Sequence, residues 1–146
     1  MTIYIEKKPY KTFVSPRMLD SYRISVILLL VGNSTTGNSK YIYMDKLHFL
    51  FDLLICDQEF NGFPKFTIPA WSIDKELKNI LIVLTRNKLI EQSYDKNKVR
   101  YSLTEKGRFK VEKIKNVDEL FLVNKKAEKL ATSVKTTEFQ KSKVIF

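Results

Sequence analysis

The residues with the clearest chemical potential are the basic side chains in the second half of this 146-residue chain. Residues 71–146 hold 18 of the 26 Lys and Arg but only 10 of the 16 Asp and Glu, so this half carries +8 of the net charge of +10. Lysine and arginine neutralise phosphates, and asparagine can pair with the edge of adenine. The pattern favours double-stranded DNA, contacted mainly through its phosphates, although the same lysines would also serve solubility alone. The candidate DNA-binding residues are Lys75, Lys78, Asn79, Arg86, Lys96, Lys98, Arg100 and Arg108.

A helix and a hairpin are predicted to position these residues. Apolar residues at helical spacing predict an amphipathic helix over 74–87. Alternating residues then predict strands over 89–94 and 99–103, joined by the polar turn DKNK at 95–98. A helix followed by a hairpin with a basic tip is the organisation of a winged-helix domain. One feature opposes DNA binding: Asp74 and Glu76 place negative charge in the first turn of the helix.

Further helices would complete such a domain. Ser15-Pro16 signals the start of a helix over 16–31, which we expect Gly32 to end, and a second helix is predicted over 43–58. Thr104 is expected to cap another helix that runs to Ile114, with Phe109 facing the core. The predicted fold is mainly α with a small β-hairpin, a winged helix-turn-helix with an additional C-terminal helix.

The first two helices are more apolar than one buried face requires. A helix that is apolar nearly all round is either the central helix of a core or part of a protein–protein interface, and the sequence leaves both open. We therefore predict partner-binding residues on these helices and in the apolar C-terminal tail: Tyr22, Leu28, Phe49, Phe51, Val144 and Phe146.

The sequence divides into three parts. Residues 1–14 are predicted to form an N-terminal arm, residues 15–115 the winged-helix domain, and residues 116–146 a C-terminal helix and tail. That helix would pack either on its own domain or on a partner.

Catalytic constellations are missing from the sequence. The single histidine, His48, lies within an apolar helix and is expected to be a partly buried core or interface residue. The single cysteine, Cys56, has no second histidine to activate it and is interpreted as a small core hydrophobe. No phosphate-binding glycine loop is present. We predict a protein that is not an enzyme, with no catalytic residue, metal ligand or cofactor site.

Composition limits the class of protein. A hydrophobic fraction of 44% is enough for one real core. The longest nearly uninterrupted apolar run, 24–31, is far shorter than the roughly 20 residues that span a bilayer. The N-terminus has no signal-peptide pattern, and one cysteine excludes a disulfide framework, so we expect a cytoplasmic protein with no membrane partner.

Four segments carry a family resemblance: SPRMLDSYRISVILLLV, MDKLHFLFDLLI, AWSIDKELKNILIVLTRNKLIE and YSLTEKG. In order and spacing they resemble the middle component of bacterial ABC-three-component systems, of which Lamassu-type anti-phage defence is one. These components are small winged-helix subunits encoded beside an SMC- or Rad50-like ATPase and an effector. The resemblance covers about residues 15–115 and implies a bridging role between ATPase, effector and DNA, without catalytic residues.

Three hypotheses follow. The leading one is a non-catalytic accessory subunit of a prokaryotic SMC/Rad50-like ATPase defence complex, with the ATPase and an effector subunit as partners. The alternative is a homodimeric winged-helix DNA-binding transcriptional regulator. A third is a structural adaptor whose basic half meets an acidic protein.

Overall fold

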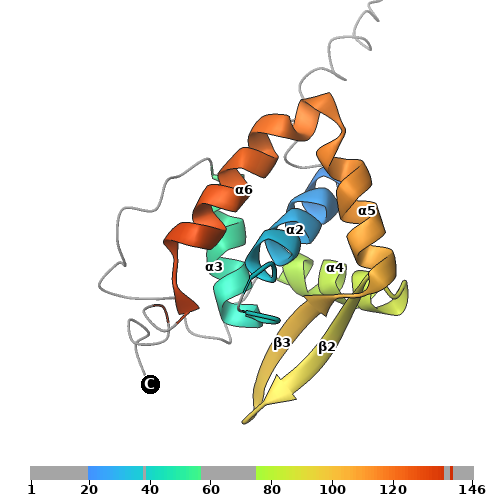
Figure 1. Ribbon diagram of the computed structural model, residues 1–146. Helices are drawn as coiled ribbons and strands as arrows, with labels where there is room; N and C mark the ends of the chain where they lie inside the picture. Colours follow the sequence, from blue (N-terminus) through green and yellow to red (C-terminus); the bar gives the residue numbers. More distant parts are fainter. Residues whose placement is uncertain (1–19, 38, 57–74, 137–138, 140–146) are drawn as a thin grey trace, which may run out of the picture.

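The computed structural model describes residues 20–37, 39–56, 75–136 and 139. Within them the protein is mainly helical with a small three-stranded antiparallel sheet, which confirms the predicted balance of elements (Figure 1). The predicted arm at 1–14, the start of the first helix, the connection at 59–70, Asp74 and the apolar tail lie outside the described residues. The elements are α2 (Asp20–Ser34), β1 (Ile42–Tyr43), α3 (Met44–Ile55), α4 (Lys75–Arg86), β2 (Ile90–Asp95), β3 (Lys98–Leu103), α5 (Glu105–Lys115), the 3₁₀ turn η4 (Asp118–Leu120) and α6 (Phe121–Ser133).

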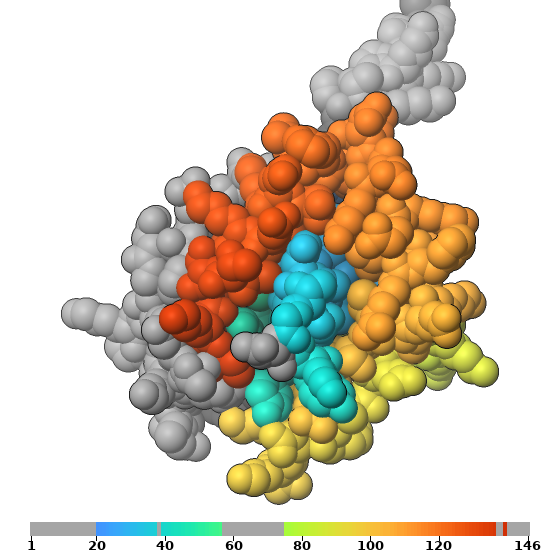
Figure 2. Space-filling view, viewed as in Figure 1, coloured from blue at the N-terminus to red at the C-terminus, as the bar shows by residue number. Residues whose placement is uncertain are grey.

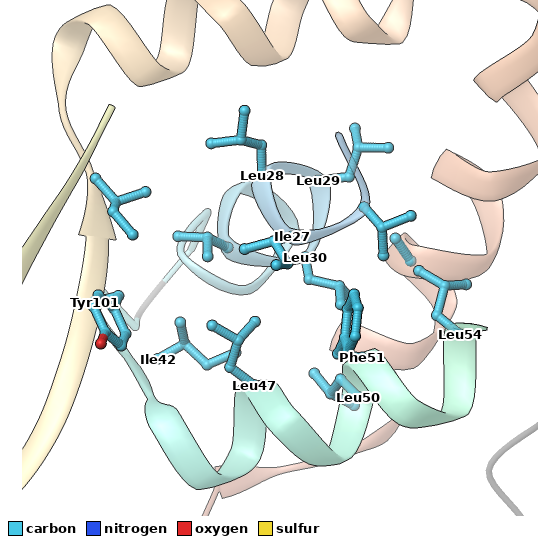
Figure 3. Close-up of a cluster of buried hydrophobic side chains, with 14 of the residues drawn as sticks. Ile27, Leu28, Leu29, Leu30, Ile42, Leu47, Leu50, Phe51, Leu54 and Tyr101 are labelled. Carbon is cyan, nitrogen blue, oxygen red and sulfur yellow. The ribbon is translucent and has the colours of Figure 1, made fainter. Parts of the chain in front are cut away.

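Helix α2 is the centre of the fold. It contacts α3, α5, α6 and β3, and its residues from Val26 to Gly32 are buried (Figure 1). Figure 3 shows Leu28 and Leu29 pointing away from α3, while Ile27 and Leu30 face it. A helix enclosed on every side must be apolar all round. Of the two alternatives left open by the sequence, the structure therefore selects the central core helix.

Gly32 does not end α2, contrary to the sequence prediction, because the helix continues to Ser34. A Cβ atom at Gly32 would lie 3.4 Å from both Leu103 Cδ1 and Val111 Cγ1, so this position of α2 is packed against β3 and α5. The helix ends where the Thr35 side chain donates to the carbonyl of Val31 at 2.8 Å.

The sheet has the strand order β1-β3-β2. The predicted hairpin is confirmed, with a loop of two residues, Lys96 and Asn97, whose φ angles are 50° and 71°. Positive φ at both positions is typical of the tight turn that suits twisted antiparallel strands. Strand β1 was not predicted, because two residues are too few to show a period. It pairs Ile42 with Tyr101.

Helix α5 begins as predicted but turns a different face to the core. Thr104 is its N-cap, accepting a hydrogen bond from the Gly107 amide at 2.9 Å. Its buried residues are Gly107, Val111 and Ile114. Phe109 is 64% exposed, so the prediction that it faces the core is wrong. It lies on the opposite side of the helix, with Lys113 Nζ 4.6 Å from its ring centroid.

Helix α6 packs on its own chain rather than standing free. Its Ala127 and Leu130, with Val134 beyond its end, belong to the same buried cluster as α2 and α3. Asn124 accepts a hydrogen bond from Asn33 of α2 at 3.1 Å. The sequence left open whether this helix packs on its own domain or on a partner, and its inner face packs on its own domain.

The two residues considered for catalysis have different environments. His48 is 5% exposed, as expected for a core residue, and its Nε2 lies 3.2 Å from Asp52 Oδ2. Cys56 is exposed at the end of α3, so its interpretation as a core hydrophobe is wrong. In the part of the chain covered by the structure, no helix is long and apolar enough to cross a membrane.

Candidate nucleic-acid interface

Helix α4 has one buried and one exposed face. Its buried stripe consists of Leu77, Ile80, Leu81 and Leu84. The opposite face exposes three of the predicted DNA-binding residues, Lys75, Asn79 and Arg86, whereas Lys78 is half-buried at its edge. The amphipathic pattern of 74–87 therefore brings four predicted residues onto one helix, with the charged groups on the side away from the core.

The acidic charge of Glu76 is compensated by a residue that the sequence pattern did not single out. Arg23, on α2, forms a salt bridge with Glu76, and the Arg23 side chain is only 12% exposed. An exposed ion pair adds little stability, but it neutralises the negative charge locally. Within the described part of α4, the first-turn carboxylate is therefore a weaker objection to phosphate binding than the sequence suggested.

The connection from α4 to the hairpin is short and hydrogen-bonded. Lys88 has a φ of 60°, and the Leu89 amide donates to the carbonyl of Leu84 at 3.0 Å. From α5, Lys106 donates to the carbonyl of Asn87 at 3.2 Å. The Thr104 amide donates to the carbonyl of Leu89 at 3.1 Å. These bonds fix the end of α4 against the start of β2 and the start of α5.

The hairpin distributes its basic residues over two places. Lys96 is exposed in the loop at the tip. Lys98 and Arg100 alternate with the buried Tyr101, so they lie on the sheet face turned away from the core. Arg100 stacks over Tyr41 with 3.8 Å between its Cζ and the ring centroid, and it donates to Ser93 Oγ at 3.0 Å.

A tyrosine–carboxylate bond supports the tip. Tyr43 donates its hydroxyl hydrogen bond to Asp95 Oδ2 at 2.6 Å, and Lys98 Nζ lies 5.7 Å from the Tyr43 ring centroid. This hydrogen bond is the main cause that raises the pKa of Tyr43, and it lowers the pKa of Asp95. Strand β1 therefore ties the end of β2 to the core.

Arg108 is separate from both groups. It lines a shallow groove between α5 and the C-terminal end of α2, together with Thr35 and Thr36. The eight predicted DNA-binding residues thus divide into three places: the exposed face of α4 with the hairpin tip, the outer face of the sheet, and the α2–α5 groove. In Figure 1 the hairpin starts near α4 and extends away from the helices to its tip.

The sequence reasoning missed several residues at this surface. Tyr94 is 65% exposed and lies four residues after the buried Ile90 in β2, so the two side chains share one face of the hairpin. Gln92, on the same side, donates to the Tyr94 hydroxyl at 2.7 Å. The next tyrosine, Tyr101, is buried, which raises its pKa to about 12. The alternation that begins at Ile90 was the signal that would have identified Tyr94.

Most of the predicted partner-binding residues lie in or against the core. Leu28 is fully buried and Phe51 is 3% exposed, so neither side chain can contribute to an exposed docking surface (Figure 3). Tyr22 and Phe49 are partly buried against the same core, and the Phe49 ring centroid lies 5.4 Å from that of Phe139. Val144 and Phe146 lie outside the described residues.

The large exposed apolar side chains of the last two helices lie elsewhere. Phe109, Val117, Phe121 and Leu122 are 64%, 40%, 54% and 71% exposed. They belong to α5, the turn at η4 and the start of α6, a set that we call the elbow. In Figures 1 and 2 the junction of α5 and α6, which carries Val117, Phe121 and Leu122, lies at the top of the described part of the chain, distant from the hairpin tip.

Comparison with known proteins gives no assignment: the chain matches no protein-family model, no curated protein and no solved structure. Among the residues that the structure describes, no group of three or more His, Cys, Asp or Glu side chains could hold a metal ion. A functional proposal therefore depends on the geometry of the surfaces and on the sequence resemblance.

Proposed function

We propose that this chain is a winged-helix module that binds duplex DNA mainly through its phosphates, and that it serves as the non-catalytic bridging subunit of a prokaryotic SMC/Rad50-like ATPase defence complex. The order α2-β1-α3-α4-β2-β3, with the sheet order β1-β3-β2, supports the winged-helix assignment. In that assignment α4 is the recognition helix and the β2–β3 hairpin is the wing.

The observation that carries the DNA-binding proposal is the basic face of α4 beside a tight basic hairpin. Lys75 and Arg86 stand at the two ends of the exposed face, and Lys96 occupies the hairpin tip. A helix about 10–12 Å across fits a major groove about 12 Å wide. The adjacent tip would then reach the neighbouring sugar–phosphate backbone. Glu76 does not oppose this placement strongly, because Arg23 compensates it.

The dependence of the DNA affinity on salt concentration tests the proposal. Four phosphate contacts, from Lys75, Lys78, Arg86 and Lys96, would give a slope of about −3.6 in log K against log salt, or roughly a 100-fold loss of affinity between 50 and 200 mM salt. Fluorescence anisotropy with a duplex of roughly 20 base pairs gives this slope directly. The double variant Lys75→Ala/Arg86→Ala should reduce the slope by about 2.

The hairpin and a control are tested in the same assay. Lys96→Ala/Lys98→Ala should weaken binding to all duplexes, whereas Lys125→Ala, which removes the same type of charge from α6, should leave the affinity within about 2-fold of the wild type. If the hairpin variant binds DNA like the wild type, the wing assignment is wrong. If α4, hairpin and Lys125 variants all change the affinity equally, binding is non-specific and no surface is assigned to DNA.

The bridging half of the proposal is supported by the elbow and by the family resemblance. Exposed apolar side chains on a small protein are typical of protein-binding surfaces. The start of α6, which carries the exposed Phe121 and Leu122, lies apart from α4 in Figure 1, so the two surfaces would be accessible at the same time. Co-expression with an SMC/Rad50-like ATPase encoded beside this chain should yield a stable complex. Phe121→Glu/Leu122→Glu should abolish co-purification and leave the affinity for DNA unchanged.

One observation favours the regulator as a second candidate. Asn79 stands in the middle of the exposed face of α4, where it can pair with a base rather than a phosphate. A homodimeric regulator should sediment as a dimer and bind one sequence roughly 10³-fold or more tighter than non-specific DNA. A monomer that binds DNA with little discrimination and co-purifies with the ATPase would exclude this alternative.

A further inference from the structure

Two apolar side chains interrupt the polar face of α4. Ile82 is 49% exposed and Val83 is 47% exposed, in contrast to the four buried residues of the same helix. Exposed aliphatic surface costs free energy in proportion to its area. A binding partner that covers this surface would remove it from water and recover that free energy, so the two residues are candidates for a contact with a ligand.

The surroundings of the pair specify the chemistry of that occupant. Asn79 is exposed three and four residues before the pair, and Arg86 is exposed four and three residues after it. Residues at these spacings are neighbours on a helix surface. The pair therefore lies between an amide, which can both donate and accept, and a cation. A surface that matches this order has a hydrogen-bonding edge, apolar groups and nearby negative charge.

The major groove of duplex DNA at A·T base pairs has all three features. Adenine presents N7 and its N6 amino group, which together match the two ends of an asparagine amide. Thymine presents an apolar C5-methyl group in the same groove, and the phosphates line its edges. Guanine and cytosine present no methyl group in this groove.

We infer that Asn79, Ile82 and Val83 read A·T base pairs: Asn79 pairs with an adenine, and Ile82 and Val83 contact thymine methyl groups. This inference rests on the proposed binding of duplex DNA by α4. The Cβ atoms of residues three or four apart on a helix lie about 5–6 Å apart. Base pairs rise about 3.4 Å. The three side chains therefore span two to three consecutive base pairs.

Of the two aliphatic residues, Ile82 is expected to contribute more. Val83 also lines a shallow groove between α2 and α4, so one side of it faces the protein; the groove is lined by Asp20, Ile24, Glu76, Asn79, Ile80 and Val83. Ile82 does not line this groove. The pair thus forms a ridge whose outer side, carried by Ile82, faces away from α2.

The test compares three duplexes, of which the first two differ only in the C5-methyl group of the major groove. One has a central A·T run with thymine, one has the same run with deoxyuridine, which lacks the C5-methyl group, and one has a G·C run. All three carry the same phosphates. Affinities are measured by fluorescence anisotropy at one salt concentration for the full chain. Each buried methyl group should contribute about 4-fold, so the wild type should bind the thymine duplex roughly 4- to 16-fold tighter than the deoxyuridine duplex.

The variants assign the preference to residues. Ile82→Ala/Val83→Ala should bind the thymine and deoxyuridine duplexes equally, which separates direct contact from any effect of the methyl group on DNA shape. Asn79→Ala should lose about 5- to 100-fold of the preference for A·T over G·C. Leu122→Ala is the matched control, because this side chain is 71% exposed but belongs to the elbow, and it should keep both preferences.

The outcomes separate this inference from the proposed function. A wild type that binds duplex DNA but does not distinguish thymine from deoxyuridine overturns the inference and leaves DNA binding intact. A wild type that binds none of the duplexes overturns both. If Ile82→Ala/Val83→Ala keeps the thymine preference but loses a protein partner, the pair is a protein-docking ridge and the inference is wrong.

Discussion

Gly107 is the residue whose replacement by alanine should damage the fold most for its size. It is buried in the first turn of α5, where a Cβ atom would overlap the carbonyl oxygen of Leu89 and lie 3.2 Å from Leu103 Cδ2. The Leu89 carbonyl cannot move freely, because it accepts a hydrogen bond from the Thr104 amide at 3.1 Å and shares the hydrogen of the Thr104 hydroxyl with the Lys88 carbonyl, at 3.1 and 2.6 Å. Gly107→Ala must therefore push α5 away from the start of β2.

The expected cost follows from three opposing contributions. Alanine gains about 1 kcal/mol over glycine in helix propensity. Weakening the two bonds to the Leu89 carbonyl costs about 1 kcal/mol each, and forced overpacking costs about 1–3 kcal/mol more. We expect the free energy of unfolding to fall by about 3 kcal/mol, which corresponds to a decrease in Tm of roughly 10 °C for a chain of this size. Because the proposed wing begins at this junction, the proposed affinity for DNA should fall as well.

Urea and thermal unfolding followed by circular dichroism measure the effect. Gly32→Ala is the matched control, since the same substitution in another buried helical position places a Cβ 3.4 Å from side chains that can adjust, and it should change stability by less than about 1 kcal/mol. A Gly107→Ala variant as stable as the wild type would falsify the close approach of α5 to Leu89 and, with it, the described junction.

Two further substitutions test the cap of α5 and the buried charge of α3. Thr104→Ala should lower the free energy of unfolding by about 1–2 kcal/mol, because the Thr104 hydroxyl accepts a hydrogen bond from the Gly107 amide and donates one to the Lys88 carbonyl at 2.6 Å. Thr104→Ser keeps the hydroxyl and should retain most of the stability. An equal loss of stability in both variants would argue against the cap. Lys46 is 5% exposed, and its burial lowers the pKa of its ammonium group from the ordinary 10.5, so the charged form is penalised in the folded protein. The free energy of unfolding of the wild type should therefore rise as the pH increases from the folded-state pKa of Lys46 towards 10.5. Lys46→Met should be more stable than the wild type at neutral pH and lose this advantage towards pH 10, as measured by the midpoints of urea unfolding. A constant difference between the two proteins at all pH values would refute the assignment.

Local patterns in the sequence were sufficient for the elements around α4. The spacing of Leu77, Ile80, Leu81 and Leu84 identifies both the helix and its buried face, and these four residues are buried. The polar turn between alternating segments predicts the hairpin, and Thr104 is confirmed as the cap of α5. Each of these features depends on residues within a few positions of one another, which is why a single sequence reveals them.

The errors concern features that depend on the rest of the fold. Phe109 is the largest apolar residue of α5, yet the small Gly107 sets the buried stripe because the Leu89 carbonyl approaches there. Gly32 was expected to end a helix, but α2 continues to Ser34. The approach of the Leu89 carbonyl to Gly107 is not encoded near either glycine in the sequence. The same applies to Arg23 and Glu76, which are 53 positions apart and meet only when α2 and α4 pack.

The central position of α2 connects the two proposed surfaces. At one end it is bound to α4 through Arg23 and Glu76, and at the other it is bound to α6 through Asn33 and Asn124. Between these contacts its residues from Val26 to Gly32 are buried, and it packs against α3, α5, α6 and β3. A subunit that bridges DNA and a protein needs two separate surfaces on one rigid body. In this chain the proposed α4–wing surface and the elbow would meet that need through one shared helix, α2. This central role also explains why α2, the most apolar segment of the sequence, is buried rather than exposed to a partner.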